Sequence, residues 1–349
     1  MKEKYENLDG FRALAAIGII LMHVRANGDF KISGFIYDRV IASFTDLTFF
    51  FMLLSAFSMC CGYYEKFKIG SINIEEFYKR RYKRIWPFFV MLCTFELIID
   101  RSLHSLYEWF ADITLAFGLL PNARISVVGV GWFIGIIFVF YIAFPFFTFL
   151  IGNKKRAWIV LIATIILNFL CNIYFLDETH VIRGFSGRVN IIYSAMFFIA
   201  GGLVFLYREK IKKLEHAWVM TLITVLCMVF YYAVNNSEYT MLILFSLLAM
   251  LGIMMSGNVS KILLQNKALS FIASISMEIY LSHMFVFRVL EKLKLTHITE
   301  NEVLNYVIVS FTTVIGAIVM AFTLKRIIEV IMIQSTEHRW RKSDESING

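Results

Sequence analysis

Two ionisable residues, Arg12 and His23, stand at either end of an apolar stretch near the N-terminus. Their separation of eleven positions on an α-helix is about three turns, or roughly 16 Å of rise, so both side chains share one face of the expected helix. Ionisable groups inside a membrane are costly and are therefore candidate functional residues. A neutral imidazole at His23 can accept a proton near pH 7. The alternative interpretation is an Arg12 that extends to the membrane surface and a His23 that is a structural, hydrogen-bonded histidine.

A basic run fills the segment Tyr78–Pro87, whose sequence is YKRRYKRIWP. A proline is well placed in the first turn of a helix, where its missing N–H has no partner to lose, so Pro87 predicts a helix start. The guanidinium groups of Arg80, Arg81 and Arg84 beside a helix start favour an anionic, phosphate-bearing ligand. The alternative is an ordinary cytosolic anchor of a membrane span.

A third polar segment, Ser274–His283, lies within an apolar region near the C-terminus. Ser274, Glu278 and Ser282 recur every four residues and therefore line one stripe of the expected helix. Glu278 is a carboxylate within a membrane span, and His283 lies near the outer end of that span. The alternative is that these residues only hydrogen-bond one helix to another.

The aromatic segment from Gly131 to Pro145 includes Trp132 and a proline inside an expected helix. By itself this pattern indicates an aromatic belt at the membrane interface with a kink, and no chemistry.

The cysteines give no sign of a metal or disulfide framework. All five lie in or at the edge of apolar runs, their number is odd, and none has the spacing of a metal site. We expect them to be small packing residues, and we expect no metal cofactor.

The composition is that of a membrane protein: 59% of the 349 residues are hydrophobic and only 17% are charged. A membrane-spanning helix needs roughly 20 apolar residues. We therefore expect an all-α integral membrane protein, with about ten transmembrane helices in a single bundle. The expected spans are 11–26, 41–62, 85–100, 131–151, 157–176, 190–207, 217–235, 239–257, 269–290 and 304–328. The segment 109–120 is also apolar but short, and fits a re-entrant or interfacial position.

The charge distribution orients these spans. Lysine and arginine gather in alternate loops, which places both termini in the cytoplasm by the positive-inside rule. The net charge of +8 is then explained by orientation and by contact with anionic membrane lipids, and we expect no nucleic-acid partner. Residues 1–330 form the expected transmembrane domain and residues 331–349 a cytoplasmic tail.

Five segments, taken in order, resemble the acyltransferase-3 family of integral membrane acyltransferases over essentially the whole chain. They are Leu8–Ala16 with His23 (the family's Arg-x10-His pattern), Phe49–Phe57, Arg84–Pro87, Trp132–Pro145 and Ser276–His283. The first-helix motif is fairly specific, and the order of all five strengthens the resemblance.

Two departures from the family pattern limit what the resemblance implies. Many members carry a glutamate five residues after the tryptophan, where this chain has Ile137. Many also append an extracytoplasmic SGNH esterase-like domain, which we do not expect here. The role of that glutamate therefore cannot be carried over to this chain. The second departure favours the compact members that modify surface polysaccharides or their lipid-linked precursors.

The resemblance implies transfer of an acyl group, acetyl by default, from a cytosolic acyl-CoA to a sugar hydroxyl. The expected partners are therefore acyl-CoA, membrane lipid and a carbohydrate acceptor, and the expected location is the cell inner membrane. The expected catalytic residues are His23, as the base, Arg12, which holds the donor near the cytosolic mouth, and Glu278. The expected donor-binding residues are Arg80, Arg81, Arg84 and Trp86. The expected acceptor-binding residues are Asp9, Ser55, Trp132, Ser276 and His283.

Two other classes of protein share parts of this pattern. Ten spans with buried charges also describe a transporter or polysaccharide exporter, although the sequence has neither an inverted repeat nor matched broken helices. A membrane scaffold is the third class, and it has no need of a histidine at position 23.

Overall fold

The computed structural model describes residues 5–119, 128–176, 179–180, 187–256 and 264–348, with side chains described up to Met332. Within these ranges all regular structure is helical, which confirms the expected all-α fold. The longer elements are α1 (Glu6–Asn27), α2 (Leu47–Met59), α4 (Ile74–Ile99), α5 (Leu103–Ile113), α6 (Trp132–Leu150), α7 (Lys154–Tyr174), α8 (Ile191–Lys212), α9 (Ala217–Ala233), α10 (Glu238–Met254), α11 (Lys267–Ser274), α12 (Ser276–Lys292) and α13 (Glu302–Asn348). The short elements are η1 (Ile36–Ile41), η2 (Phe44–Asp46), η3 (Cys60–Tyr64), α3 (Glu65–Lys68), η4 (Ala116–Leu119) and η5 (Gly187–Val189).

The protein is a multi-pass membrane protein. Among the described residues, six helical stretches are long and apolar enough to cross a membrane: Glu6–Asn27, Ile36–Lys68, Trp132–Leu150, Lys154–Tyr174, Ile191–Lys212 and Glu302–Met332. A seventh crossing is formed if the bent pair α11 and α12 counts as one span. The helices α9 and α10 are apolar but have only 17 residues each. The prediction of ten spans with cytoplasmic termini therefore stays a prediction, and residue 257 of the expected span 239–257 lies outside the described residues.

The expected helix start at Pro87 is wrong, because α4 begins at Ile74 and Pro87 lies inside it. The expected span 85–100 is the second half of α4, and the basic run lies in the first half. Two ion pairs join α4 to α12: Arg84 with Glu278, and Glu96 with Arg288. The two pairs are twelve residues apart on α4 and ten residues apart on α12. Because the first pair comes first along both helices, α4 and α12 run side by side in the same direction. The apolar half of α4 thus follows α12 through the bundle.

The helix α5 folds back along α4. The indole of Trp109 donates a hydrogen bond to Thr94 Oγ1 at 3.1 Å, and the indole of Trp86 donates to the carbonyl oxygen of Ile113 at 2.9 Å. The short apolar segment expected at 109–120 therefore begins within a hairpin on α4, and its residue 120 lies outside the described part of the chain.

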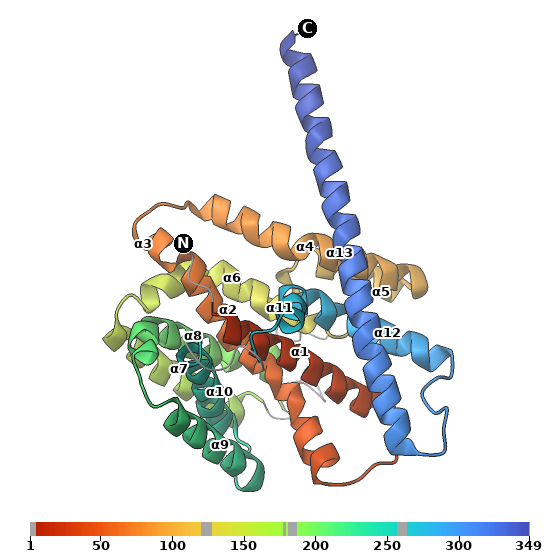
Figure 1. Cartoon of the computed structure of the whole chain (residues 1–349). Helices are drawn as coiled ribbons and strands as arrows, with labels where there is room; N and C mark the ends of the chain where they lie inside the picture. The colour runs from red at the N-terminus through yellow and green to blue at the C-terminus, as the bar shows by residue number, and fades with distance from the viewer. Residues whose placement is uncertain (1–4, 120–127, 177–178, 181–186, 257–263, 349) are drawn as a thin grey trace.

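Small residues allow α1 to lie at the centre of the bundle (Figure 1). Its buried residues include Gly10, Ala13, Ala15 and Ala16. A Cβ atom on Gly10 would lie 2.4 Å from the carbonyl oxygen of Leu264, so only glycine permits this approach. Small residues at helix contacts are typical of membrane bundles, where van der Waals packing stabilises the association.

The helices α2 and α8 pack closely in the same way. A Cβ atom on Gly201 would lie 2.2 Å from the carbonyl oxygen of Leu53, and the rings of Phe49 and Phe197 stack at 4.3 Å. This contact fixes the position of α2.

The motif segment near the C-terminus is broken. The helices α11 and α12 meet at Ile275 at an angle of 78°. Two cations from other helices bind the carbonyl oxygen of Ser274 at this break: Lys325 Nζ of α13 at 3.2 Å and Arg84 Nη2 of α4 at 3.4 Å. The expected single span 269–290 is therefore a bent one, and the bend places Glu278 against α4 and α13.

Candidate active site

A cavity of about 360 Å³ lies between α1, α2, η3, α4, α6 and α11–α12. This volume falls in the range of small-molecule sites, about 300–1,000 Å³. Its lining includes three arginines, Arg12, Arg81 and Arg84. The residues in its lining that carry a hydroxyl group are Ser55, Ser58, Ser276, Tyr63, Tyr141 and Tyr280. The cavity therefore combines strong positive charge with hydroxyl groups inside a helical membrane bundle.

Arg12 is fixed in the cavity wall by two partners. Its Nη1 atom lies 3.0 Å from Asp9 Oδ1, one turn earlier on α1, and its Nη2 donates to Ser58 Oγ of α2 at 2.8 Å. A guanidinium group has five N–H donors in a rigid fork. Arg12 therefore retains donors for an anionic ligand while it holds α1 and α2 in register.

Arg84 shares a buried carboxylate with a second cation. Its Nη1 lies 3.0 Å from Glu278 Oε1, and Lys325 Nζ lies 3.3 Å from the same oxygen. The Glu278 side chain is 3% exposed, and its Oε2 atom has no hydrogen-bond partner among the described residues. A buried carboxylate is stable only when it is paired and hydrogen-bonded, so this cluster joins α4, α12 and α13.

Arg81 is held by aromatic rings. Its Nη2 donates to Tyr63 Oη at 2.6 Å, and its guanidinium lies 4.9 Å from the Tyr63 ring centroid and 5.7 Å from that of Tyr141. Arginine stacks on aromatic faces without losing its charge. Arg81 and Arg84 thus present their charges to the same cavity from one helix.

His23 and His283 face each other across α1 and α12, with ring centroids 5.0 Å apart. His283 is fully buried, and its Nδ1 lies 2.5 Å from the carbonyl oxygen of Tyr280. Because a carbonyl can only accept a hydrogen bond, Nδ1 carries the proton, and Nε2 of the neutral ring carries a lone pair. Nε2 is buried and has no hydrogen-bond partner in the described part of the chain. The pair therefore contains a buried, unoccupied proton acceptor.

Tyr280 connects the cavity to the histidine pair. It lines the cavity, its ring centroid lies 5.8 Å from that of His283, and its hydroxyl donates to the carbonyl oxygen of Val130 at 2.9 Å. Neither histidine lines the cavity itself. Arg12 and His23 thus lie at two levels along α1, because roughly 16 Å of helix separates them.

Comparison with known proteins places this arrangement in a family. A family model described as an acyltransferase domain matches residues 5–322. The chain belongs to the acyltransferase-3 family. No curated protein and no solved structure matches it. The resemblance inferred from the motifs is thereby confirmed.

The structure brings most of the residues expected from the acyltransferase-3 motifs to one region. Arg12, Ser55, Arg81, Arg84 and Ser276 line the cavity. At its edges, Asp9 and Glu278 pair with Arg12 and Arg84, and His23 and His283 form the pair described above. Their roles in catalysis or binding remain predictions.

Three further expected residues of this acyltransferase-3 protein neither line the cavity nor take part in the pairs just described. Arg80 is exposed and pairs with Glu76 one turn earlier on α4. Trp86 is 42% exposed and bonds to α5. Trp132 lies at the start of α6, with the guanidinium of Arg188 5.8 Å from its ring centroid.

Three residues that contact this acyltransferase-3 site, Ser58, Lys325 and Arg188, were not predicted from the sequence. Ser58 binds Arg12. It could have been identified from the sequence, because it lies three residues after Ser55 and therefore on the same face of α2. Lys325 pairs with Glu278. It could also have been identified, because an ionisable residue inside an apolar span is a candidate functional residue. Arg188 hydrogen-bonds Thr45 and faces Trp132, and its loop position gave no comparable signal.

Proposed function

We propose that this acyltransferase moves an acyl group, acetyl by default, from acyl-CoA to a hydroxyl of a cell-surface polysaccharide or its lipid-linked precursor in the inner membrane. The observation that carries the proposal is the succession of an arginine-lined cavity, Tyr280 and a histidine pair in one membrane bundle. Each part has a role in such a transfer.

The cavity suits the donor. Coenzyme A carries phosphates, and arginine binds phosphate through short, charge-assisted hydrogen bonds. In the proposed complex Arg81 and Arg84 bind these phosphates, and Arg12 holds the pantetheine arm as it passes toward Tyr280. Trp86 and Arg80 have no part in this complex, because neither lines the cavity.

The histidine pair suits the acceptor hydroxyl, which is a poor nucleophile until a base removes its proton. In the proposed reactive arrangement His283 Nε2 accepts a hydrogen bond from one ring nitrogen of His23. The other nitrogen of His23 is then the proton acceptor, which is how a base is oriented by a third group in other acyl transfers. His23 is thus the base, and His283 is a positioning residue.

His23 takes the hydroxyl proton while the acceptor oxygen attacks the thioester carbon of the acyl-CoA. The C–O bond forms, the C–S bond breaks, and the departing coenzyme A thiolate takes the proton from His23. The products are the O-acylated sugar and free coenzyme A, and His23 returns to its neutral form.

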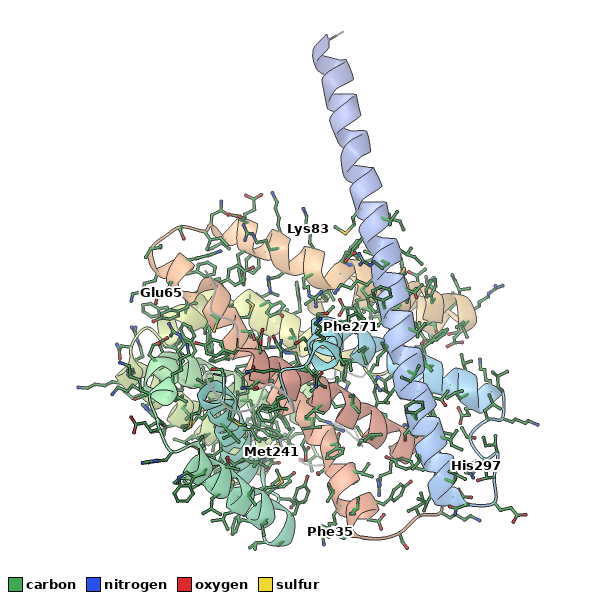
Figure 2. All side chains as sticks on the ribbon, viewed as in Figure 1. Phe35, Glu65, Lys83, Met241, Phe271 and His297 are labelled. Carbon is green, nitrogen blue, oxygen red and sulfur yellow. The ribbon has the colours of Figure 1, made fainter. Side chains whose placement is uncertain are left out.

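We also propose ten crossings with both termini in the cytoplasm. Figure 2 supports two opposite faces: Glu65 and Lys83 lie on one side of the body, and Phe35, Met241 and His297 lie on the other. The first two belong to the basic segment between the second and third expected spans. Phe35 and His297 lie between spans on the side expected outside, and Met241 lies near the outer end of the expected span 239–257. In this arrangement the apolar half of α4, which runs beside α12, forms the third crossing. The charged first half of α4 keeps the whole helix from meeting the composition test for a span.

The test is transfer of label from radiolabelled acetyl-CoA to mixed cell-envelope glycans by the purified protein in nanodiscs, beside His23→Ala. We expect labelled glycan with the wild-type protein only, and equal acetyl-CoA binding by both proteins. Labelled glycan from His23→Ala at the wild-type rate would exclude His23 as the base. A wild-type protein that neither binds acetyl-CoA nor labels glycan would contradict the proposed function.

A further inference from the structure

A second hollow shares no lining residue with the active-site cavity. It has a volume of about 350 Å³ and is formed by α7, α8 and α10. Its lining is mostly apolar, and the lining residues that matter here are Trp158, Ala200, Tyr207, Lys210, Leu214 and Ser246. The acyl-transfer proposal makes no use of this hollow.

The polar groups in this lining are satisfied, with one exception. Ser246 Oγ donates to the carbonyl oxygen of Leu242 at 2.7 Å, and Tyr207 Oη accepts from the Trp158 indole at 3.1 Å. Lys210 has no carboxylate partner among the described residues. An occupant of the hollow must therefore be apolar along its length and anionic at the level of Lys210.

A basic surface adjoins the apolar hollow. Lys154 Nζ lies 4.6 Å from the ring centroid of Tyr207, which also lines the hollow. Lys154 lines a neighbouring depression together with Lys68, Lys155, Arg208 and one acid, Glu65. Of these cations Arg208 pairs with Glu209, whereas no described carboxylate pairs with Lys68, Lys154 or Lys155. The excess of positive charge beside an apolar hollow complements an anionic amphiphile.

The dimensions indicate a lipid. Lys210 and Ala200 are ten residues apart on α8, or roughly 15 Å. That is half of the hydrocarbon core of about 30 Å, and so the depth of one leaflet. The rim includes Trp158 and Leu214, each 49% exposed, so the hollow is open on an apolar face that a lipid can reach from the side.

We propose that this hollow binds one acyl chain of an anionic phospholipid, with the phosphate between Lys154 and Lys210. The chain follows α8 toward Ala200 and Ser246. The site lies against the element that lines the donor cavity, because Tyr64 lines the basic depression and the preceding Tyr63 holds Arg81.

The test is native mass spectrometry of the purified full-length protein, titrated with phosphatidylglycerol or with phosphatidylcholine of the same chains. We expect tighter binding of phosphatidylglycerol, and about tenfold weaker binding of it to the double variant Lys154→Ala/Lys210→Ala. The matched control is Lys79→Ala/Lys213→Ala, which removes the same charge from the same end of the molecule but touches neither hollow. Equal affinity for the two lipids, or an equal loss in the control, would overturn the proposal.

The chain is tested separately. Ser246→Leu adds apolar bulk inside the hollow. Among the described residues the serine bonds only to its own helix, so the substitution leaves no partner there unpaired. We expect weaker retention of phosphatidylglycerol by this variant and no effect of soluble glycerol phosphate on either protein. Full displacement of the lipid by glycerol phosphate would show that the basic surface binds phosphate alone, and would refute the chain site.

Discussion

At the scale of single residues, Glu278 depends on two cations. Arg84 and Lys325 lie 3.0 and 3.3 Å from the same carboxylate oxygen, and they approach from different helices. Removal of one cation leaves the buried carboxylate paired with the other. Arg84 is therefore free to be tested for donor binding without loss of the fold.

We predict that Arg84→Ala raises the KM for acetyl-CoA about tenfold or more, since a charged hydrogen bond to phosphate is lost. The measurement is the initial rate against donor concentration in nanodiscs. Arg80→Ala is the matched control: it removes an equal charge one turn away, outside the cavity, and we expect a small change. An equal rise in KM for both variants would show that only the general positive charge of α4 matters.

We predict that the double variant Arg84→Ala/Lys325→Ala is destabilised by about 3–5 kcal/mol, because it leaves the buried carboxylate without a cation. Thermal unfolding in detergent measures this, with each single variant alongside. Adding Glu278→Gln removes the charge and is expected to restore most of the lost stability. A double variant as stable as the wild type would contradict the pairing.

The residue motifs located much of the candidate site in advance, and simple geometry explains two that fell outside it. On a helix Trp86 lies about 200° from Arg84, so it points away from the cavity once Arg84 points in. Arg80 has Glu76 one turn before it, which holds its side chain at the surface. Ser58 and Lys325 needed the packing of α2 and α13 to be identified.

At the scale of elements, the break between α11 and α12 is the feature that the sequence concealed. The segment 267–292 contains neither proline nor glycine, and its hydropathy is that of a single span. The carbonyl of Ser274, freed by the break, is bound by Arg84 and Lys325 from α4 and α13. A bend stabilised by side chains from distant segments cannot be predicted from the local sequence.

We predict that Gly201→Ala is destabilised by about 1–3 kcal/mol, because the new methyl group must move α2 away from α8. Thermal unfolding in detergent is the measurement. Gly129→Ala is the control, since no described atom lies within 4 Å of its added Cβ. Unchanged stability in Gly201→Ala would show that the α2–α8 contact adapts easily.

At the scale of the whole molecule, the apolar runs predicted where helices occur, but they did not determine how many of these helices cross the membrane. Each expected span begins in or overlaps a helix of the structure. Among the described residues, composition identifies six spans, or seven with the bent pair, because α9 and α10 are short and the first half of α4 is charged. Crossing depends on neighbours as well as on hydropathy, as the ion pairs between α4 and α12 illustrate.

We predict that alkaline phosphatase is active when fused after Arg101 or Asn235, and inactive when fused after Gly349, because only the first two positions lie outside in a ten-span arrangement. Enzyme activity in whole cells measures this, with green fluorescent protein at the same positions as the reciprocal reporter. An inactive fusion after Arg101 would show that α4 does not cross.

In the proposed acyl transfer His23 and His283 act together. The most direct measurement is the rate of acetyl transfer by the wild-type protein, His23→Gln, His283→Asn and the double variant. Asparagine at 283 can keep the bond to the Tyr280 carbonyl while it removes the Nε2 lone pair. We predict that each single variant loses about 100-fold or more in kcat with donor binding unchanged, and that the double variant loses little more than either. A loss of kcat in the double variant equal to the product of the two single losses would show that the two histidines act independently. A His283→Asn protein with the wild-type rate would show that His283 does not position His23.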